Sequence, residues 1–197
     1  GNPVRRSVIE GNRARGREAL GVPEDAVLLL VFGGSLGAQH LNERVASLKG
    51  ELLSRDNLYI LHSTGADGFE DTERALALTP DEAKRYRVQP YIDNMGDMLA
   101  AADLVLSRSG ASSVAEIAAL AVPSVLVPYP HATADHQTIN ARYLVDAGAG
   151  VLCADAEIDA PAFADELLHL VDDAAARDDM REAARGLAQD RAASLLA

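Results

Sequence analysis

The stretch Ala26-Val27-Leu28-Leu29-Leu30-Val31-Phe32, ended by Gly33-Gly34, decides the fold of this chain. A short continuous apolar run of this kind is typical of a strand that is buried on both faces of a sheet. Helical periodicity follows, through Leu41, Val45 and Leu48. A buried strand, a glycine turn and a helix in this order indicate the first unit of a parallel α/β fold.

The same order of elements repeats along the chain. We expect further strands at 58–61, 87–90, 104–106, 123–128 and 151–153, and helices at 38–54, 68–77, 95–102, 112–121, 135–147, 160–172 and from 174 onward. Strands that alternate with helices predict a Rossmann-like parallel sheet with helices on both faces, in one α/β domain over residues 1–197. The carboxyl ends of such strands lie at one edge, where ligands bind, so the loops after the strands should carry the functional residues.

Composition limits the kinds of partner. The chain has 18 basic and 30 acidic residues, which gives a formal net charge of −12. Such a surface repels nucleic acid at long range, so we expect no nucleic-acid partner. An anionic ligand would instead need a local site, built from backbone N–H groups and a few arginines.

Membrane and cysteine signals are few. No apolar stretch approaches the roughly 18 residues of a membrane span, and the first residues show no signal peptide. Cys153 is the only cysteine, so no internal disulfide can form, which fits a reducing cytoplasm. It stands in the run 150–154, where we expect a buried strand and a cysteine that packs as a small hydrophobic side chain.

Two interpretations are open for the first loop, Gly33-Gly34-Ser35-Leu36-Gly37-Ala38-Gln39. Glycines let the backbone turn sharply and approach a ligand closely, and the following helix offers free N–H groups to an anion. The same residues would also make a tight strand-to-helix turn with no ligand. The spacing matches neither a dinucleotide-binding fingerprint nor a phosphate loop.

The second loop crowds serines and one arginine at a helix start, in Ser107-Arg108-Ser109-Gly110-Ala111-Ser112-Ser113-Val114-Ala115-Glu116. Small residues at a helix N-terminus leave room for a diphosphate, and the hydroxyls add donors. From the pattern alone, however, Ser113 and Glu116 match a capping box, in which Glu116 only satisfies the helix's own backbone. The functional alternative is that Glu116 accepts hydrogen bonds from the two hydroxyls of a ribose.

The third loop, Val127 to Ala141, is polar and holds two histidines. His131 and His136 invite a metal site, but no cysteine or acidic cluster completes one, so we expect no metal. Asp135 is a good N-cap. That assignment leaves His136 and Gln137 exposed on the first turn of a helix and facing the strand ends.

The fourth loop is Pro90-Tyr91-Ile92-Asp93-Asn94-Met95-Gly96-Asp97-Met98. Its simplest interpretation is a helix start with an apolar staple. A functional interpretation would use the backbone groups around Ile92 to recognise the flat edge of a base.

With these loops, the chain resembles over nearly its whole length the C-terminal, donor-binding domain of the MurG family. Members of that family are bacterial transferases that move N-acetylglucosamine from UDP onto lipid I, forming lipid II in peptidoglycan synthesis. The matching motifs are Gly1-Asn2-Pro3-Val4-Arg5, Gly33 through Gln39, Tyr91 through Met95, Arg108-Ser109-Gly110-Ala111 through Glu116, and Val127-Pro128-Tyr129-Pro130-His131 through Asn140. The last two motifs are specific to the family, whereas glycine turns alone are not.

The resemblance implies a role for each matching residue. Glu116 would bond the ribose hydroxyls, which reverses the preference for a capping box. Ser35 would touch phosphate, and the backbone at Ile92 would read the uracil edge. Gln137, with His136, would bond hydroxyls of the sugar. Two further assignments complete the site: Arg5 would lie near the donor, and the diphosphate would rest on the helix start made by Ala111, Ser112, Ser113, Val114, Ala115 and Glu116.

The resemblance also implies what this chain lacks. Its family pairs two Rossmann-like domains in the GT-B fold, with the active site between them, so an N-terminal acceptor domain would precede this one. The general base, the lipid I site and the apolar membrane patch would belong to that domain, and no residue of this chain is expected to be catalytic. The implied hexosyltransferase is inverting, needs no metal or cofactor, and works in the cytoplasm at the inner face of the membrane. This fragment alone would be inactive.

Two rival functions stay open. The chain could be the donor-binding subunit of an N-acetylglucosaminyltransferase that is split in two, and a partner subunit would then be found with it. It could also be a non-catalytic module that binds a UDP-sugar. The tail after Arg177 departs most from the family pattern, so the helix that returns to the acceptor domain is in doubt.

Overall fold

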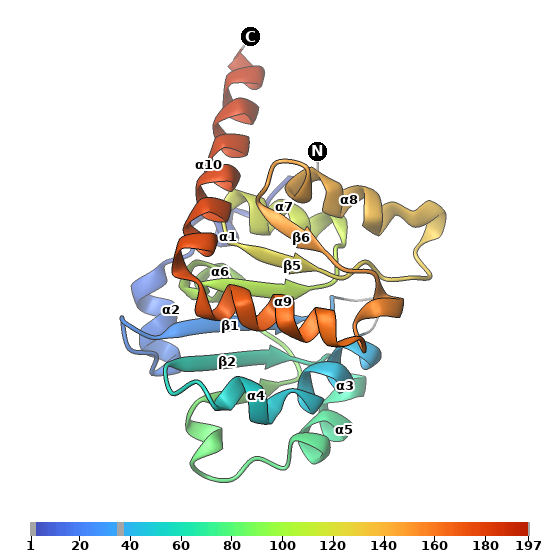
Figure 1. Ribbon diagram of the computed structural model, residues 1–197. Helices are drawn as coiled ribbons and strands as arrows, with labels where there is room; N and C mark the ends of the chain where they lie inside the picture. The colour runs from blue at the N-terminus through green and yellow to red at the C-terminus, as the bar shows by residue number, and fades with distance from the viewer. Residues whose placement is uncertain (1–2, 35–37, 197) are drawn as a thin grey trace.

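The chain forms a parallel sheet with helices on both faces, as the sequence predicts (Figure 1). The computed structural model describes residues 3–34 and 38–196. Every pairing in the sheet is parallel, and the strand order is β3-β2-β1-β4-β5-β6. The strands are β1 Val27–Phe32, β2 Leu58–Ser63, β3 Tyr86–Gln89, β4 Leu104–Ser107, β5 Ser124–Leu126 and β6 Gly150–Leu152.

The sheet order reverses at β1, which pairs with β2 on one side and β4 on the other. Phe32 at the end of β1 is in register with Ser63 and with Ser107. The loops that follow these strands therefore leave the sheet side by side. In open parallel sheets this switch point is where ligands bind, so the fold brings the predicted loops to the expected edge.

Two apolar cores lie on opposite faces of the sheet. Leu29 and Val31 of β1 point to one core and Leu28 and Leu30 to the other, and all six residues of β1 are buried, which confirms the opening prediction. The helices over the first core are α3 Gln39–Ser47, α4 Lys49–Leu53, α5 Ala66–Leu76 and α9 Pro161–Asp172. Those over the second are α1 Arg6–Ile9, α2 Arg13–Leu20, α6 Met95–Ala101, α7 Ala111–Ala119 and α8 His136–Val145.

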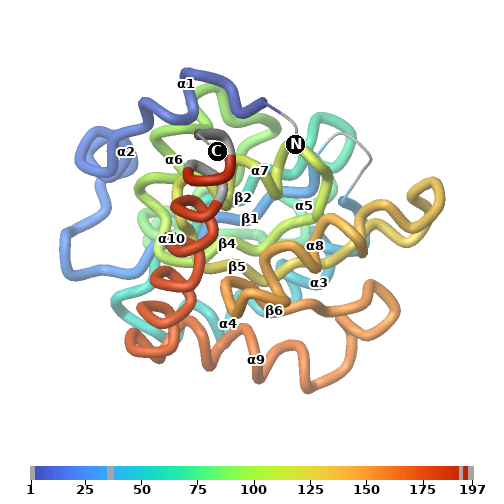
Figure 2. Tube along the Cα trace, turned by 90° about the horizontal axis from the view of Figure 1, so that it is seen from above, coloured from blue at the N-terminus to red at the C-terminus, as the bar shows by residue number. Residues whose placement is uncertain are grey.

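The last helix, α10 Ala174–Leu196, packs against α7 and α9 and extends beyond the body of the molecule (Figures 1 and 2). Single turns of 3-10 helix, η1 Glu82–Lys84, η2 Thr133–Asp135 and η3 Asp155–Glu157, complete the described elements. The helix expected at 38–54 is interrupted at Leu48, which divides it into α3 and α4. Neither α1 nor α2 was expected from the sequence.

Strand β6 is less buried than the sequence suggests. It lies at the edge of the sheet, and its three residues are only half-buried. Cys153 follows the strand and is also half-buried, packed against the first core. The expected buried strand is therefore wrong here, because β6 has a neighbour on one side only. Burial still raises the pKa of the Cys153 thiol, with a smaller contribution from nearby carboxylates.

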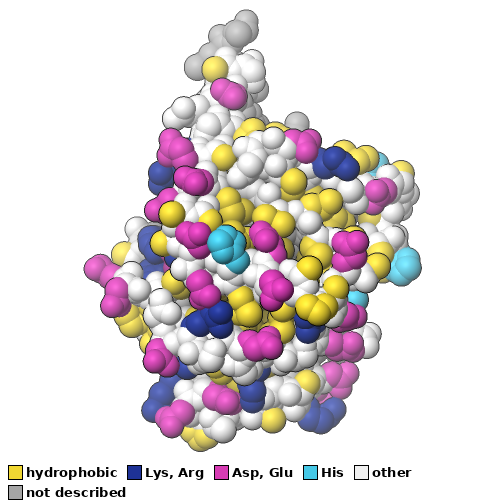
Figure 3. Space-filling model, viewed as in Figure 1, with side chains coloured by type: hydrophobic (Ala, Val, Ile, Leu, Met, Phe, Trp, Pro, Cys, Tyr) yellow, Lys and Arg dark blue, Asp and Glu magenta, His cyan; other side chains and the backbone are white. Residues whose placement is uncertain are grey.

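Acidic side chains are scattered over the face that α9 covers, with basic side chains between them (Figure 3). Among the described residues, no helix is long and apolar enough to span a membrane. In the same part of the chain, no three His, Cys, Asp or Glu side chains gather in a way that could hold a metal ion.

Candidate functional site

The central element of the candidate site is the start of α7. The helix begins at Ala111, and its N-cap position is held by Gly110, which offers no side chain to the helix amides. Ser113 is therefore the third residue of the helix rather than its cap. The capping box suggested by the pattern of Ser113 and Glu116 is wrong, because the helix starts earlier than that pattern assumes.

Among the described residues, the first amides of this helix have no hydrogen-bond acceptor. The first α7 amide with a backbone partner belongs to Val114, which donates to the Gly110 carbonyl at 3.0 Å. Ala111 and Ser112 are exposed, Ser113 and Ala115 are half-buried, and Val114 is buried in the second core. No acidic residue stands in the first turn. Free N–H groups, the helix dipole and small polar side chains together suit an anion.

Glu116 is buried one turn into this helix and is paired with Arg5. Nη2 of Arg5 lies 2.8 Å and its Nε 2.9 Å from Oε1 of Glu116. The Glu116 side chain is 9% exposed and that of Arg5 66% exposed. The structure thus brings together two of the residues that the resemblance placed near the donor. Among the described residues, Oε2 of Glu116 accepts no hydrogen bond.

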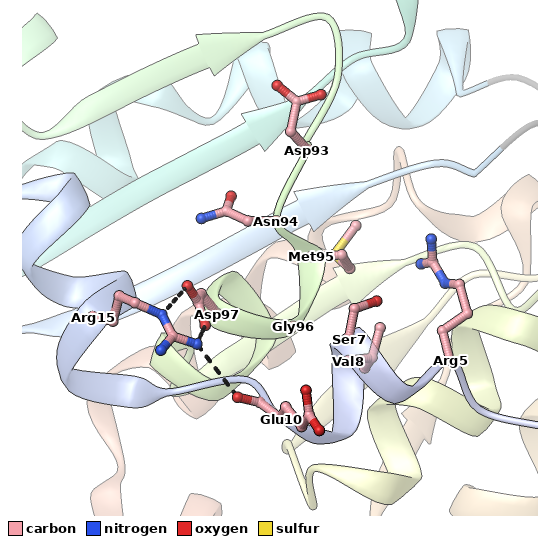
Figure 4. Close-up of a pocket in the computed structure, with 10 residues that line it drawn as sticks. All are labelled: Arg5, Ser7, Val8, Glu10, Arg15, Asp93, Asn94, Met95, Gly96 and Asp97. Atoms are coloured by element: carbon pink, nitrogen blue, oxygen red, sulfur yellow. Dashed lines mark hydrogen bonds and ion pairs between the residues drawn. The ribbon is translucent and has the colours of Figure 1, made fainter.

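Arg5 reaches Glu116 because the N-terminal segment is seated against α6 (Figure 4). A cavity of about 340 Å³ lies there, lined by residues of the segment and of the fourth loop, Asp93 among them. Arg15 closes one side, with Nε 2.7 Å from Oδ2 of Asp97 and Nη2 2.7 Å from its Oδ1. These hydrogen bonds hold the pKa of Asp97 low, at about 2.

Gln137 is not exposed as predicted. It is 5% exposed, and its Oε1 accepts hydrogen bonds from the backbone N–H of Ser109 at 3.1 Å and of Tyr129 at 2.9 Å. The Ser109 hydroxyl donates to the Gln137 carbonyl at 2.7 Å. Gln137 therefore ties the loop after β5 to the loop that begins α7. Its Nε2 faces Gly110, 3.9 Å from where a Cβ there would stand, and donates to no described residue.

His136 is exposed at the start of α8, as predicted. Asp135 occupies the N-cap position, but its side chain accepts from the Thr138 hydroxyl at 2.6 Å and caps no amide. Ala134 and Asp135 both have positive φ, 51° and 54°. Left-handed backbone is costly for Ala, less so for Asp, and such strain concentrates at functional sites.

Ile92 is half-buried and packs against the second core, while Tyr91 beside it is exposed. Neither the N–H nor the carbonyl of Ile92 forms a hydrogen bond within the described part of the chain.

Ser35, expected to touch phosphate, lies outside the described residues. Gly33, two positions before Ser35, is required sterically, since a Cβ there would lie 1.9 Å from the Cβ of Ala38.

Sequence reasoning missed a cluster of charged side chains around Asp155. Arg108, in the second loop, is 4% exposed, and its Nη1 lies 2.6 Å from Oδ1 of Asp155. Oδ2 of Asp155 lies 2.9 Å from Nδ1 of His40. The only signal was a lone arginine after a buried strand, and Asp155 stands 47 residues from Arg108 and 115 residues from His40 in the chain.

A second cavity, of about 570 Å³, opens between α3 and α5. Its charged lining residues are all acidic, namely Glu43, Asp67 and Asp71. Such a lining repels phosphate, so the start of α7 suits an anionic ligand better than this larger cavity does.

Comparison with known proteins shows the family of this chain. Residues 28–196 match the family model of the glycosyltransferase family 28 C-terminal domain. A curated relative from Desulforudis audaxviator (strain MP104C) is 38% identical over 98% of this chain and 52% of its own length. Another, from Salinibacter ruber, is 41% identical over 100% of this chain and 52% of its own length. Both are named UDP-N-acetylglucosamine--N-acetylmuramyl-(pentapeptide) pyrophosphoryl-undecaprenol N-acetylglucosamine transferase.

Solved structures give the same result. The crystal structure of MurG from Acinetobacter baumannii matches with a TM-score of 0.72 and 32% identity, over 91% of this chain and 50% of that one. The glycosyltransferase WaaG matches in fold, with a TM-score of 0.64 and 20% identity, over 95% of this chain and 48% of that one. The chain spans about half the length of the curated relatives it matches. Since the family model runs from β1 through α10 and the sheet is that of GT-B C-terminal domains, the chain belongs to the glycosyltransferase family 28 C-terminal domain family.

Proposed function

We propose that this chain binds UDP-N-acetylglucosamine as the donor half of an inverting hexosyltransferase that transfers N-acetylglucosamine to lipid I. The observation that carries the proposal is the start of α7, where amides that are free among the described residues and serine hydroxyls stand beside the buried Glu116 and its exposed partner Arg5. The printed names of the curated relatives support the same donor and acceptor.

The diphosphate would rest on the free amides of Ala111 and Ser112. Helix dipole and N–H groups stabilise negative charge there, and no carboxylate in the first turn opposes it. The same groups would stabilise UDP as it departs, so that the reaction needs no metal ion. The exposed guanidinium of Arg5 adds positive charge nearby.

The nucleoside would be read by groups that the fold leaves unpaired. Oε2 of Glu116 can accept from ribose hydroxyls while Oε1 stays bonded to Arg5. The free N–H and carbonyl of Ile92 offer the donor and acceptor that a uracil edge requires. The sugar would meet the exposed side chain of His136 and the unpaired Nε2 of Gln137.

The acceptor side would come from a second domain. Transfer requires an acceptor held within reach and a base for its proton, and positioning supplies much of the rate. We assign neither role to a residue of this chain. In the complete protein an N-terminal domain would supply both, at the inner face of the cell membrane, since the acceptor in the relatives' name carries undecaprenol.

The test is to titrate the folded chain with UDP and UDP-N-acetylglucosamine by calorimetry, and then to assay UDP release with a soluble lipid I analogue. We expect both nucleotides to bind and no turnover above background. Turnover comparable to that of a two-domain transferase would refute the division of labour. A chain that is folded by circular dichroism yet binds neither nucleotide would refute the donor site.

A further inference from the structure

Asp155 lies outside the four loops of the candidate site, but its side chain contacts Arg108 in the loop after β4 and His40 in helix α3. It is the first residue of η3, three positions after the end of β6, and its side chain is 15% exposed. Oδ1 accepts from Nη1 of Arg108 at 2.6 Å, and Oδ2 lies 2.9 Å from Nδ1 of His40. One carboxylate therefore joins the loop after β4 to the helix that follows β1.

The first contact fixes the turn that begins α7. The guanidinium of Arg108 also donates to the carbonyls of Val127 and Pro128, each at 3.4 Å, and lies 5.7 Å from the ring centre of Tyr129. Nε of Arg108 is buried with no hydrogen-bond partner in the described part of the chain. Asp155 thus supplies the carboxylate that compensates a buried guanidinium between two donor-site loops.

The second contact fixes the start of α3. His40 is the second residue of that helix, which follows the glycine turn. Its Nδ1 lies against Asp155 and its Nε2 lies 2.8 Å from Oδ2 of Asp159. A neutral imidazole has only one N–H, so His40 can donate to both carboxylates only when it is protonated. These hydrogen bonds, that to Asp155 above all, raise the pKa of His40 against the effect of burial.

We propose that Asp155 is a positioning residue of the donor site, which holds the start of α7 through Arg108 and the start of α3 through His40. This inference rests on the proposed function, because it presumes that the donor binds between these two helix starts. Asp155 itself would not touch the donor. It follows that protonated His40 strengthens donor binding, and that this contribution is lost as the pH rises through the pKa of His40.

Other charged groups near His40 could also make donor binding depend on pH, and the experiment must separate their contribution from that of His40. Asp155 and Asp159 face it from the loop after β6, with Arg108 behind Asp155, while Glu43 and Arg44 share its helix. The ligand should be UDP-N-acetylglucosamine and not UDP. The terminal phosphate of UDP has a pKa of about 6, so its own titration would add to the pH dependence of binding. His136 stands in the proposed site, so only the difference between wild type and a His40 variant is informative.

The experiment measures the affinity of the chain for UDP-N-acetylglucosamine from pH 6 to pH 8, with melting temperature recorded for each variant. Asp155→Asn keeps the shape but loses the charge, and it should weaken binding about tenfold, or about 1.4 kcal/mol, which lies within the cost of leaving a buried polar group poorly satisfied. His40→Gln leaves no buried charge unpaired, and it should weaken binding on the order of threefold at pH 6 and hardly at all at pH 8.

Asp172→Asn is the control. Asp172, at the end of α9 and away from the donor loops, forms an ion pair with Arg55 that is more exposed than the pair of Asp155 and Arg108. We expect it to leave both affinity and pH profile unchanged.

Wild-type affinity in Asp155→Asn, whatever its melting temperature, would overturn the inference while leaving the proposed function intact. An unchanged pH profile in His40→Gln would overturn the part assigned to His40. Failure of the wild type to bind would overturn the proposed function, and this inference with it.

Discussion

Arg5 and Glu116, 111 positions apart in the chain, form an ion pair in which Nη2 of Arg5 lies 2.8 Å from Oε1 of Glu116. The pair joins the segment before α1 to a buried position of α7. A carboxylate that is 9% exposed needs such a partner, because an unpaired buried charge is costly. The N-terminal segment is therefore part of the candidate site and not merely a connection.

Replacing Glu116 by Ala should weaken UDP binding by about 1.5–3 kcal/mol, the scale for losing hydrogen bonds to a charged group. The carboxylate would lose its bonds to the ribose hydroxyls, and Arg5 would lose its anchor. Calorimetry on the variant, after circular dichroism shows that it is folded, measures the effect.

Glu116→Gln and Arg5→Ala refine this test. Gln keeps an acceptor of the same size, so its loss should be smaller than that of Ala. Arg5→Ala removes a mostly exposed side chain and should weaken UDP binding without lowering the melting temperature much. UDP affinity that is unchanged in Glu116→Ala would mean that the carboxylate serves only to hold Arg5.

Gln137→Ala should lower both stability and affinity. Removing Oε1 leaves the amides of Ser109 and Tyr129 without their acceptor, at a cost of about 1–3 kcal/mol. Because these amides belong to two donor-site loops, UDP and UDP-N-acetylglucosamine should both bind more weakly. Thermal unfolding and calorimetry with both ligands check this.

Gln137→Glu separates the structural role from contact with the sugar. A carboxylate still accepts from the two amides but replaces the Nε2 donor. The new carboxylate is buried without a cationic partner, so we expect stability below that of wild type, and the informative result is a reduced preference for UDP-N-acetylglucosamine over UDP. His136→Ala, at an exposed position, should reduce the same preference with no change in melting temperature. An undiminished preference in both variants would show that this pair does not read the sugar.

The fold could be predicted because its information is local. The apolar run of β1 and the strands that follow show their burial in consecutive residues, and every predicted strand exists. Helix α2 was missed for the opposite reason. Its buried residues are Gly16 and Arg17, so it has no apolar stripe to read. Arg17 is buried because it bonds the carbonyls of Pro23, Ala26 and Ala101, which no periodicity reveals.

The candidate site was predictable in part. The loops and the start of α7 follow from strand order and from small residues after a strand. The burial of Gln137 did not follow, because its partners are backbone amides brought near only by the folded sheet. The contacts of Arg108 and His40 with Asp155 are equally long-range. From the sequence alone, a polar residue in a loop is predicted to be exposed, because its hydrogen-bond partners are brought near only by the fold.

Acid should destabilise the chain through His62 before it protonates most carboxylates. His62 is fully buried between the Tyr86 hydroxyl, at 2.8 Å, and Oδ1 of Asn42, at 2.9 Å. Burial lowers its pKa to about 3. The unfolded chain binds a proton near pH 6.5 and the folded chain does not, so this stabilisation is present above pH 6.5 and is lost as the pH falls toward 3.

The expected slope is about 1.4 kcal/mol of unfolding free energy per pH unit, for one proton. Urea unfolding between pH 6.5 and 5 measures it. His40, whose pKa is raised, acts in the other window, because its stabilisation is complete below pH 6.5 and declines above it. In His62→Gln the slope below pH 6.5 should flatten, whatever the absolute stability, and a slope that persists would contradict the assignment.

Gly96→Ala should displace the N-terminal segment and so weaken donor binding from a distance. A Cβ at Gly96 would lie 2.4 Å from the Ser7 carbonyl oxygen and 2.8 Å from the Val8 Cα, which are backbone atoms that cannot turn aside. Overpacking of this kind costs about 1–3 kcal/mol, and relief would come from moving α1, which carries Arg5 away from Glu116.

Gly50→Ala is the matched control, in α4 with open space around it, and should stabilise the chain by about 0.5–1 kcal/mol. Melting temperature and UDP affinity should therefore both fall in Gly96→Ala. Neither should fall in Gly50→Ala. If Gly96→Ala lost stability yet bound UDP as tightly as wild type, the seating of the N-terminal segment would be irrelevant to the donor site.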